Sequence, residues 1–479
     1  MPLILPGNVG SATAATGFDV ANSLRFNDGS TDNLSRTKGT SDSTTKGTYS
    51  FWFKLSKTTG LTLIENGTAS ADRAIVYIAS DSTLKIFSKI GNSTKLDLNT
   101  NRVFRDLNAW YNLVLAIDTT QGTASNRVKL YINGTQETSF GTETYPDQDD
   151  ALRFFTSSEI EEIGIDFENG GLFDGYMCEV VKVDGSQLAP TSFGEFDEDS
   201  GIWKPIDVSG LTFGTNGFYL DFEDSSALGN DAAGSNNFTV NNLTAIDQST
   251  DTCTNNFATF NSLTPSLQSG GVVAYSEGNT KIVTAYSNAN YLRYPQAYTT
   301  LGVTSGKWYA EFKIGAIGSA SVGIANTGQF GSDGSTNPYA GYAASGAVYT
   351  NGGEYRADDG SVGSQGTYTE DDIIGCALDM DNLKIYWHKN GTYINSGDPT
   401  SGATGTGARA VLAPTTPGGF YVFTAGADNT GIATIEANFG SPSYSESGGE
   451  TDGNGFGNFN QSVPSGYFAL CTKNLAEYG

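Results

Sequence analysis

The sequence predicts an all-β protein built from two antiparallel β-sandwich modules of the jelly-roll type, joined by an irregular connector. Short apolar stretches alternate along most of the chain with clusters of Gly, Asn, Asp and Ser, which is the pattern of short strands and tight turns. The 479 residues include 27 Phe, 24 Tyr and 5 Trp, enough aromatic side chains to fill packed cores. No convincing amphipathic helix interrupts the strand-like stretches.

The first module is expected over residues 21–196. Its predicted strands carry apolar residues at alternating positions and end at turn-forming residues. They are SLRFN (23–27), TYSFWFKLS (48–56), RAIVYIAS (73–80), TLKIFSKI (83–90), WYNLVLAID (110–118), RVKLYING (127–134) and GYMCEVVKVDG (175–185). Residues 1–20 are small, polar and unpatterned, and we predict that they form an N-terminal arm suited to docking on a partner.

The second module is expected over residues 263–442. Its predicted strands are VVAYS (272–276), KWYAEFKIG (307–315), SVGIAN (321–326), DIIGCALDM (372–380), LKIYWHKNG (383–391), FYVFTAG (420–426) and IATIEANFG (432–440). In 383–391 the apolar residues Leu383, Ile385 and Trp387 share one face, which places His388 on the opposite face beside an Asn-Gly turn. We therefore expect an exposed, outward-pointing His388.

Two further segments are interpreted from their composition. Residues 197–262 are the most polar, turn-like part of the chain, so we interpret them as a connector with short strands. Residues 443–479 are Gly-rich until SGYFALCTKNL restores apolar spacing. The C-terminal segment is therefore expected to pack back on a module.

The charge balance argues against nucleic acid as a partner. The chain has 52 Asp and Glu against 26 Lys and Arg, with a formal net charge of −26, and such a surface repels phosphates. Its apolar runs are shorter than the roughly 20 residues that a membrane helix needs. The N-terminus lacks the basic and apolar regions of a signal peptide, so we expect neither membrane insertion nor export.

Both modules resemble known families. The stretches SGKWY (305–309), YTEDDIIGCALDMDNLKIYWHKNGTYI (368–394) and IEANFG (435–440) resemble a SPRY domain. The stretches SLRFNDGSTDNLSRT, TYSFWFKL, WYNLVLAID, KLYING and LFDGYMCEVVKVDGSQLAP resemble the laminin-G or concanavalin A-like lectin and glucanase superfamily. Both resemblances imply a two-sheet antiparallel jelly roll, in agreement with the strand pattern.

A third resemblance concerns the biological context. TSFGEFDEDSGIWKPIDVSGL and the segment that follows it to TCTNNFATFN are similar to connectors in tail-fibre-like and other virion proteins of marine bacteriophages, as are LPGNV and GFDVANSLRFNDG. This implies a non-enzymatic protein on the phage particle surface, as a tail fibre or capsid appendage. It also implies other virion proteins as partners, a host-surface polysaccharide as candidate ligand, and a homo-oligomer, by analogy a trimer. A purely structural decoration or adaptor protein is the alternative.

The sequence predicts no catalytic set. Related glucanases use a strand motif Glu-x-Asp-x-Glu, and the nearest match is IGIDFEN. Asp166 and Glu168 would share a strand face with Glu162, but Gly164 stands where the nucleophile is expected. The single histidine, His388, makes Ser-His-Asp schemes unattractive. We expect no enzyme, and a jelly-roll glycan hydrolase is the less favoured alternative.

Candidate ligand-binding residues lie in loops of the second module. Sugar recognition needs aromatic faces together with polar side chains, and STNPYAGY (335–342) and GGEYRADDG (352–360) supply both. The SPRY resemblance implies binding at loops of one end of the sandwich. We therefore select Tyr339, Tyr342, Tyr355 and Arg356, with the alternative that these aromatic rings pack against their own loops.

Acidic loops leave a Ca²⁺ site open as an alternative. NDGSTDN (27–33), YPDQDD (145–150) and RADDG (356–360) offer the oxygen ligands that Ca²⁺ prefers. Hydrated turn carboxylates explain the same residues without an ion, and none of these loops matches a defined calcium motif. We assign no metal ligands.

Overall fold

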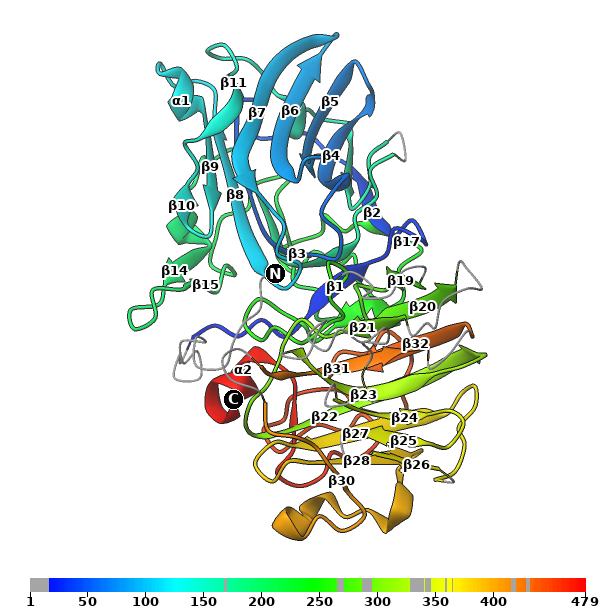
Figure 1. Cartoon of the computed structure of the whole chain (residues 1–479). Coiled ribbons are helices and arrows are strands. Elements are labelled where there is room, and N and C mark those ends of the chain that lie inside the picture. Colours follow the sequence, from blue (N-terminus) through cyan, green and yellow to red (C-terminus); the bar gives the residue numbers. More distant parts are fainter. Residues whose placement is uncertain are drawn as a thin grey trace. The chain divides into compact units, whose positions relative to one another are not determined.

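The computed structural model describes two compact units (Figure 1). The first unit is Ala15–Thr254 and the second includes Asn255–Gly479. The described residues are 17–167, 170–264, 271–286, 295–327, 340, 346–357, 360–363, 365–414, 419–427 and 431–479. Nearly all strand pairs are antiparallel, which confirms the all-β prediction. In the described part of the chain, no helix is long and apolar enough to cross a membrane.

The first unit contains two large sheets. The β3 sheet has the order β10 (Thr135–Gln136), β9 (Val128–Ile132), β8 (Trp110–Asp118), β3 (Lys46–Leu55), β13 (Gly175–Asp184), β1 (Ser23–Phe26), β18 (Gln248–Ser249), with β16 (Phe218–Leu220) paired to β13. The β5 sheet has the order β11 (Phe140–Thr144), β7 (Ser93–Val103), β6 (Thr83–Ile90), β5 (Asp72–Ile78), β4 (Leu61–Ala69), β12 (Ile160–Ile163), β2 (Asn33–Thr37), β17 (Thr239–Asn241).

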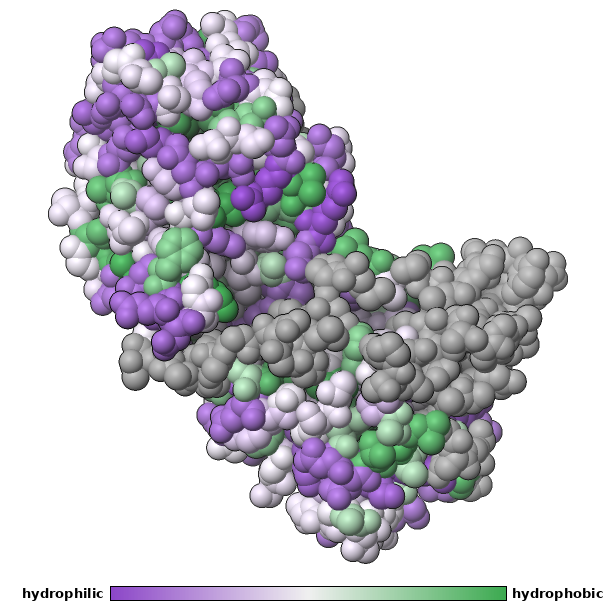
Figure 2. All heavy atoms as spheres, turned by 60° about the vertical axis from the view of Figure 1, so that its left-hand side comes forward, coloured by the Kyte–Doolittle hydropathy of each residue, from purple (hydrophilic) through white to green (hydrophobic). Residues whose placement is uncertain are grey.

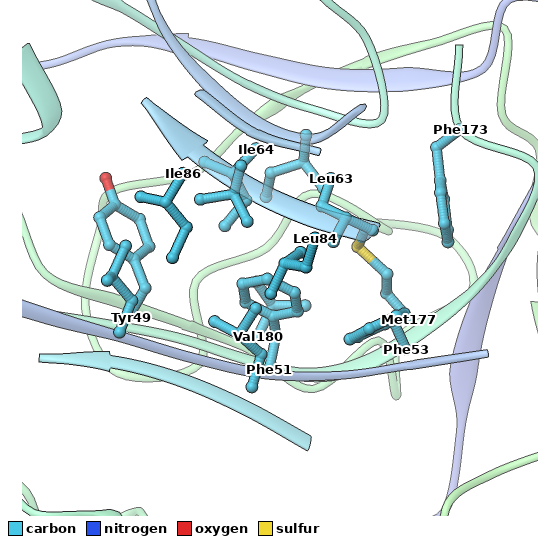
Figure 3. Packing of buried hydrophobic residues seen from close by; sticks show 14 of the residues in the cluster. Tyr49, Phe51, Phe53, Leu63, Ile64, Leu84, Ile86, Phe173, Met177 and Val180 are labelled. Atoms are coloured by element: carbon cyan, nitrogen blue, oxygen red, sulfur yellow. The ribbon is translucent and has the colours of Figure 1, made fainter. Parts of the chain in front are cut away.

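The core of the first unit lies between these two sheets. Figure 3 shows Phe51 and Phe53 of β3 facing Leu63, Leu84 and Ile86 of the β5 sheet. Each of these side chains is at most 1% exposed, because alternate residues of each strand point to the same face. This packing accounts for the period of two in the sequence.

The segment expected to be a separate connector belongs largely to the first unit. Its strand β15 (Trp203–Pro205) forms a hairpin with β14 (Gly194–Phe196), which ends just before the segment. Trp203 packs with Trp52 and Trp110 on the outer face of the β3 sheet, and its Nε1 donates a hydrogen bond to Asn112 Oδ1 (3.0 Å). This segment therefore covers the outer face of the β3 sheet. Hydrophilic residues occupy much of the surface of the first unit that Figure 2 shows.

The second unit also has two sheets. The β22 sheet has the order β19 (Gly271–Ser276), β20 (Lys281–Tyr286), β32 (Ala433–Asn438), β22 (Lys307–Ile317), β27 (Ile373–Asp379), β28 (Lys384–Lys389), β29 (Thr392–Tyr393), with β30 (Arg409–Ala410) on β28 and β33 (Phe468–Ala469) on β22. The β23 sheet has the order β21 (Gln296–Tyr298), β31 (Tyr421–Gly426), β23 (Ser321–Asn326), β24 (Gly346–Thr350), β25 (Tyr355–Ala357), β26 (Gly360–Val362).

The C-terminal segment 443–479 covers the outer face of the β22 sheet. Phe459 and Tyr467 pack against Tyr309 and Tyr386, and β33 pairs in parallel with β22. His388 lies on this covered face and is 1% exposed. The prediction of an exposed His388 is wrong, because the alternation of β28 gives the side of the sheet but not the segment that covers it.

A buried hydrogen-bond network joins His388 to the C-terminal segment. Gly391 N donates to His388 Nδ1 (3.2 Å), which leaves the ring proton on Nε2, 2.6 Å from the Tyr309 hydroxyl. That hydroxyl donates to Glu311 Oε1 (3.0 Å). The backbone N–H groups of Asn460 and Gln461 also donate to Glu311, at 2.9 and 2.8 Å. Glu311 therefore ties the C-terminal segment to β22.

We expect the second unit to lose stability as the pH rises from 6.5 to 8. Burial raises the pKa of Glu311 from 4.5 to about 7, so the folded state favours the protonated form and stability is lost as the pH rises through this value. Burial lowers the pKa of His388 from 6.5 to about 4, which costs stability as the pH falls through 6.5 and so offsets part of the Glu311 loss at the lower end of the range. The expected net loss is about 0.5 kcal/mol.

Urea unfolding at the two pH values measures this loss, with a hydrogen-exchange pulse at one fixed pH to report on peptides from 443–479. Glu311→Gln should remove this loss of stability between pH 6.5 and 8, because an amide does not titrate in this range. If the loss persists in this variant, another group causes it.

Candidate functional site

The outer face of the β5 sheet carries a mixed set of aromatic and cationic side chains. Ala74, Val76 and Ile78 of β5 point into the core, so their neighbours in sequence point outward. The antiparallel register then aligns β5 with β6, which lies beside it in Figure 1. The outward residues of the two strands are Arg73, Ile75, Tyr77, Lys85, Phe87 and Lys89.

These six side chains line a pocket of about 410 Å³. The lining is completed by Gly60, Thr62 and Ser70 and by Asp166, Gly170 and Gly171 of the loop after β12. In this loop, Gly170 N donates to Asp166 Oδ1 (2.8 Å). A Cβ on Gly171 would lie 2.4 Å from Thr62 Oγ1, so a side chain there would clash with the pocket wall.

Arg73 is held at the pocket by groups around and beneath it. Its Nε lies 2.7 Å from Glu65 Oε1, and its guanidinium stacks 4.8 Å from the centre of the Phe167 ring. Phe167 N donates to Glu65 Oε2 (2.9 Å), which fixes the carboxylate in turn. Burial raises the pKa of Glu65 to about 7, against the opposing effect of Arg73. Arg73 is thus positioned by a buried carboxylate.

Two lysines flank the Phe87 ring. Lys85 Nζ lies 5.8 Å and Lys89 Nζ 5.0 Å from the ring centre, within the range of cation–π contact. Lys85 also pairs with Asp97 on β7 at 3.5 Å. Phe87 and Tyr77 are half-buried, so their rings stand partly open to solvent between charged groups.

Asp166 of IGIDFEN does not lie on the strand face that the sequence predicted. Strand β12 ends at Ile163, and Asp166 lies in the following loop, while Glu168 lies outside the described residues. Gly164 has φ +89°, and a Cβ there would lie 2.8 Å from the Phe26 ring. The position expected for a nucleophile therefore requires glycine.

Glu162 instead faces Glu65 across the paired strands β12 and β4. Burial, together with the charge of Asp166, raises the pKa of Glu162. Both glutamates thus lie beside the pocket, where burial favours their protonated, neutral forms.

The four ligand-binding candidates of the second module do not form a described site. Tyr339 and Tyr342 lie outside the described residues. Tyr355 is 2% exposed and stacks on Trp387 at 4.8 Å between ring centres, so its ring belongs to the core and is not available to a ligand. Arg356 is half-buried and donates from Nε to Glu354 Oε2 (2.9 Å). The role of Arg356 in ligand binding therefore stays a prediction.

The acidic loops proposed for Ca²⁺ make internal contacts. Asp32 accepts a hydrogen bond from Asn27 N (2.9 Å), and Asp150 pairs with Lys95 (3.1 Å). Within the described ranges, no group of three or more His, Cys, Asp or Glu side chains is arranged to hold a metal ion. The Ca²⁺ alternative therefore gains no ligand set from these residues.

Sequence reasoning missed the pocket residues on β5 and β6. The signal was present in RAIVYIAS and TLKIFSKI, because the residues that alternate with the core positions include Tyr77, Phe87 and three cations. The sequence-based candidates were loop residues, whereas the residues of this site lie on a strand face.

Residues 28–185 match the model of the Concanavalin A-like lectin/glucanases superfamily. The first unit contains a concanavalin A-like domain. Every lining residue of the pocket falls within the matched range. This confirms the resemblance inferred for the first module from its strand motifs. A search of curated proteins found no match to the chain.

Several solved structures are similar to part of the chain at low sequence identity. A pentraxin from Limulus polyphemus is 16% identical, with 36% of this chain and 80% of that chain covered and a TM-score of 0.28. A putative carbohydrate binding protein from Bacteroides ovatus is 17% identical (47% and 59%, TM-score 0.32), and the SPRY domain of human HERC1 is 16% identical (32% and 86%, TM-score 0.22). Similarities this distant carry no argument about activity.

Proposed function

We propose that the concanavalin A-like domain binds carbohydrate in the pocket on the outer face of the β5 sheet. The observation that carries this proposal is the pair of half-buried rings, Tyr77 and Phe87, set among charged side chains in one pocket. Aromatic rings stack on the apolar face of a pyranose, while charged groups bind its hydroxyls. The volume of about 410 Å³ lies within the range of small-ligand sites.

The position of the pocket supports binding to a preformed surface. Tyr77 and Phe87 project from the paired strands β5 and β6, whose opposite face is packed into the core. A ligand that docks on such a surface orders few flexible groups, so little affinity is lost to conformational entropy.

We propose a binding role without hydrolysis. Glu65 is paired with Arg73, and Asp166 accepts a hydrogen bond from Gly170 N. Gly164 cannot be replaced by a carboxylate without backbone strain and a clash with Phe26. The carboxylates beside the pocket therefore support its structure. Release of reducing sugar from a bound polysaccharide would contradict this proposal.

A virion setting is a separate proposal, which rests on the resemblance of the segment 197–262 to phage connectors. In that setting, the pocket would contact host-surface polysaccharide and other surfaces would contact neighbouring virion proteins. Mass spectrometry of purified particles tests the location. A decoration or adaptor role would be favoured by presence in the particle together with no glycan binding.

Phe87→Ala and Tyr77→Ala should each weaken glycan binding about tenfold, because each removes a stacking surface that is worth about 1–2 kcal/mol when buried by the ligand. A glycan array with the full chain identifies the ligand, and calorimetry measures its affinity for each variant.

Phe196→Ala is the matched control. This ring is 51% exposed on β14, outside the pocket, so its loss should leave affinity unchanged. An equal loss of affinity in all three variants, or no binding of any glycan by the wild-type chain, would show that the pocket does not bind carbohydrate.

A further inference from the structure

The pocket is a cationic site on an acidic protein. The chain has a formal net charge of −26, yet the pocket is lined by Arg73, Lys85 and Lys89 and by one carboxylate, Asp166. Among the residues that line the pocket, cations therefore outnumber carboxylates three to one, whereas in the whole chain carboxylates outnumber cations. Such an arrangement favours a ligand with negative groups at defined positions rather than general attraction of polyanions.

Lys89 has the simplest surroundings of the three. Its Nζ lies 5.0 Å from the centre of the Phe87 ring, and it takes part in no ion pair among the described residues. Lys85, on the other side of the ring, is 28% exposed and pairs with Asp97 at the long distance of 3.5 Å. Both ammonium groups therefore retain capacity for an incoming anion next to the stacking surface.

Arg73 offers a directed donor at the same pocket. Its ion pair with Glu65 and its stacking on Phe167 orient the planar guanidinium, and its Nη2 lies 3.8 Å from Asp166 Oδ2. A guanidinium held in this way matches the paired oxygens of a carboxylate or sulfate.

We propose that the ligand is an anionic glycan, whose carboxylate or sulfate groups bind Lys85, Lys89 and Arg73 while its sugar rings stack on Tyr77 and Phe87. This inference rests on the proposed function and specifies its ligand class. A neutral glycan would cover the three cations without adding an anionic partner, and that desolvation opposes binding. At physiological salt the Debye length is about 8 Å, so repulsion from distant carboxylates is screened while contact pairs persist.

Calorimetry with the full chain and matched oligosaccharides tests this proposal. One pair is an oligogalacturonate and its carboxyl-reduced form, and the other is a sulfated carrageenan oligomer and its desulfated form. In at least one pair, the anionic member should bind at least about tenfold more tightly. The pair that shows the preference identifies the anion as carboxylate or sulfate.

Lys89→Gln and Lys85→Gln should each weaken binding of the anionic member about five- to tenfold and change binding of the neutral member less than about twofold. Lys129→Gln is the matched control, since Lys129 is a half-buried lysine on β9 of the other sheet. It should bind both members as the wild-type chain does.

Different failures have different meanings. Equal affinity for the two members of each pair would overturn the anionic preference and leave carbohydrate binding intact. If the chain bound neutral glycans on the array but no member of either oligosaccharide pair, the anionic preference would also be overturned and carbohydrate binding would stand. If Lys129→Gln weakened binding of the anionic member as much as Lys85→Gln and Lys89→Gln do, the anion would be attracted by lysines in general and not by this pocket. That result would overturn the inference. No binding of any glycan would overturn the proposed function itself.

Discussion

Glu161→Gln is expected to lower the free energy of unfolding of the first unit by about 3–5 kcal/mol. Glu161 is fully buried between the sheets, where its carboxylate lies 2.6 Å from Arg36 Nη2 and 2.8 Å from Lys182 Nζ and accepts a hydrogen bond from Tyr49. Burial alone would raise the pKa of Glu161, but Lys182 and Arg36 hold it well below its usual range. The amide would leave two buried cations without their counter-charge.

Urea unfolding of the full chain, followed by hydrogen exchange of individual peptides, measures this loss, and peptides of the second unit serve as an internal reference. Glu143→Gln, an exposed glutamate on β11, should change stability by less than about 0.5 kcal/mol. Adding Lys182→Met to Glu161→Gln should restore part of the loss, because it removes one uncompensated cation. A loss below about 1 kcal/mol in Glu161→Gln would contradict this account.

Trp387→Ala is expected to lower the free energy of unfolding of the second unit by about 3–5 kcal/mol. The Trp387 side chain is 1% exposed and stacks on Tyr355. Its Nε1 donates to Val322 O (3.2 Å), so the indole links β28 of one sheet to β23 of the other. Its removal leaves a cavity and breaks this hydrogen bond between the two sheets.

The same urea and hydrogen-exchange measurement reports this loss, now with peptides of the first unit as the reference. Leu412→Ala is the matched control, because Leu412 is 49% exposed in the same unit and its truncation opens no cavity. The expected change for the control is within about 0.5 kcal/mol. Similar losses in both variants would show that Trp387 does not join the sheets.

The strands themselves were well predicted, because strand formation depends on a local pattern. TLKIFSKI was expected over 83–90 and β6 is Thr83–Ile90, while RAIVYIAS overlaps β5. In each, the alternation of apolar and polar residues separates the side chains that face the core from those that face outward. The pocket residues Tyr77 and Phe87 therefore follow from the alternation once the outer face is known to be open.

The segment 197–262 has polar residues that bond within the protein. Asp231 is 3% exposed and accepts hydrogen bonds from the backbone N–H groups of Tyr219, Ala233 and Asn236. A polar side chain that holds a turn cannot be told from a solvated one by composition. Composition therefore predicted a connector with short strands, but not the packing of Trp203 on the outer face of the β3 sheet.

Local sequence patterns predicted the fold class, the strands and the two sides of each strand. Which side is covered depends on tertiary packing, since the covering segments come from distant parts of the chain. His388 lies beneath the C-terminal segment and Tyr355 lies against Trp387, although the local pattern or loop context of each favoured exposure. The outer face of β5 and β6, by contrast, keeps a pocket. The alternation of side chains along a strand specifies its two faces, and long-range packing decides which face stays open to a ligand.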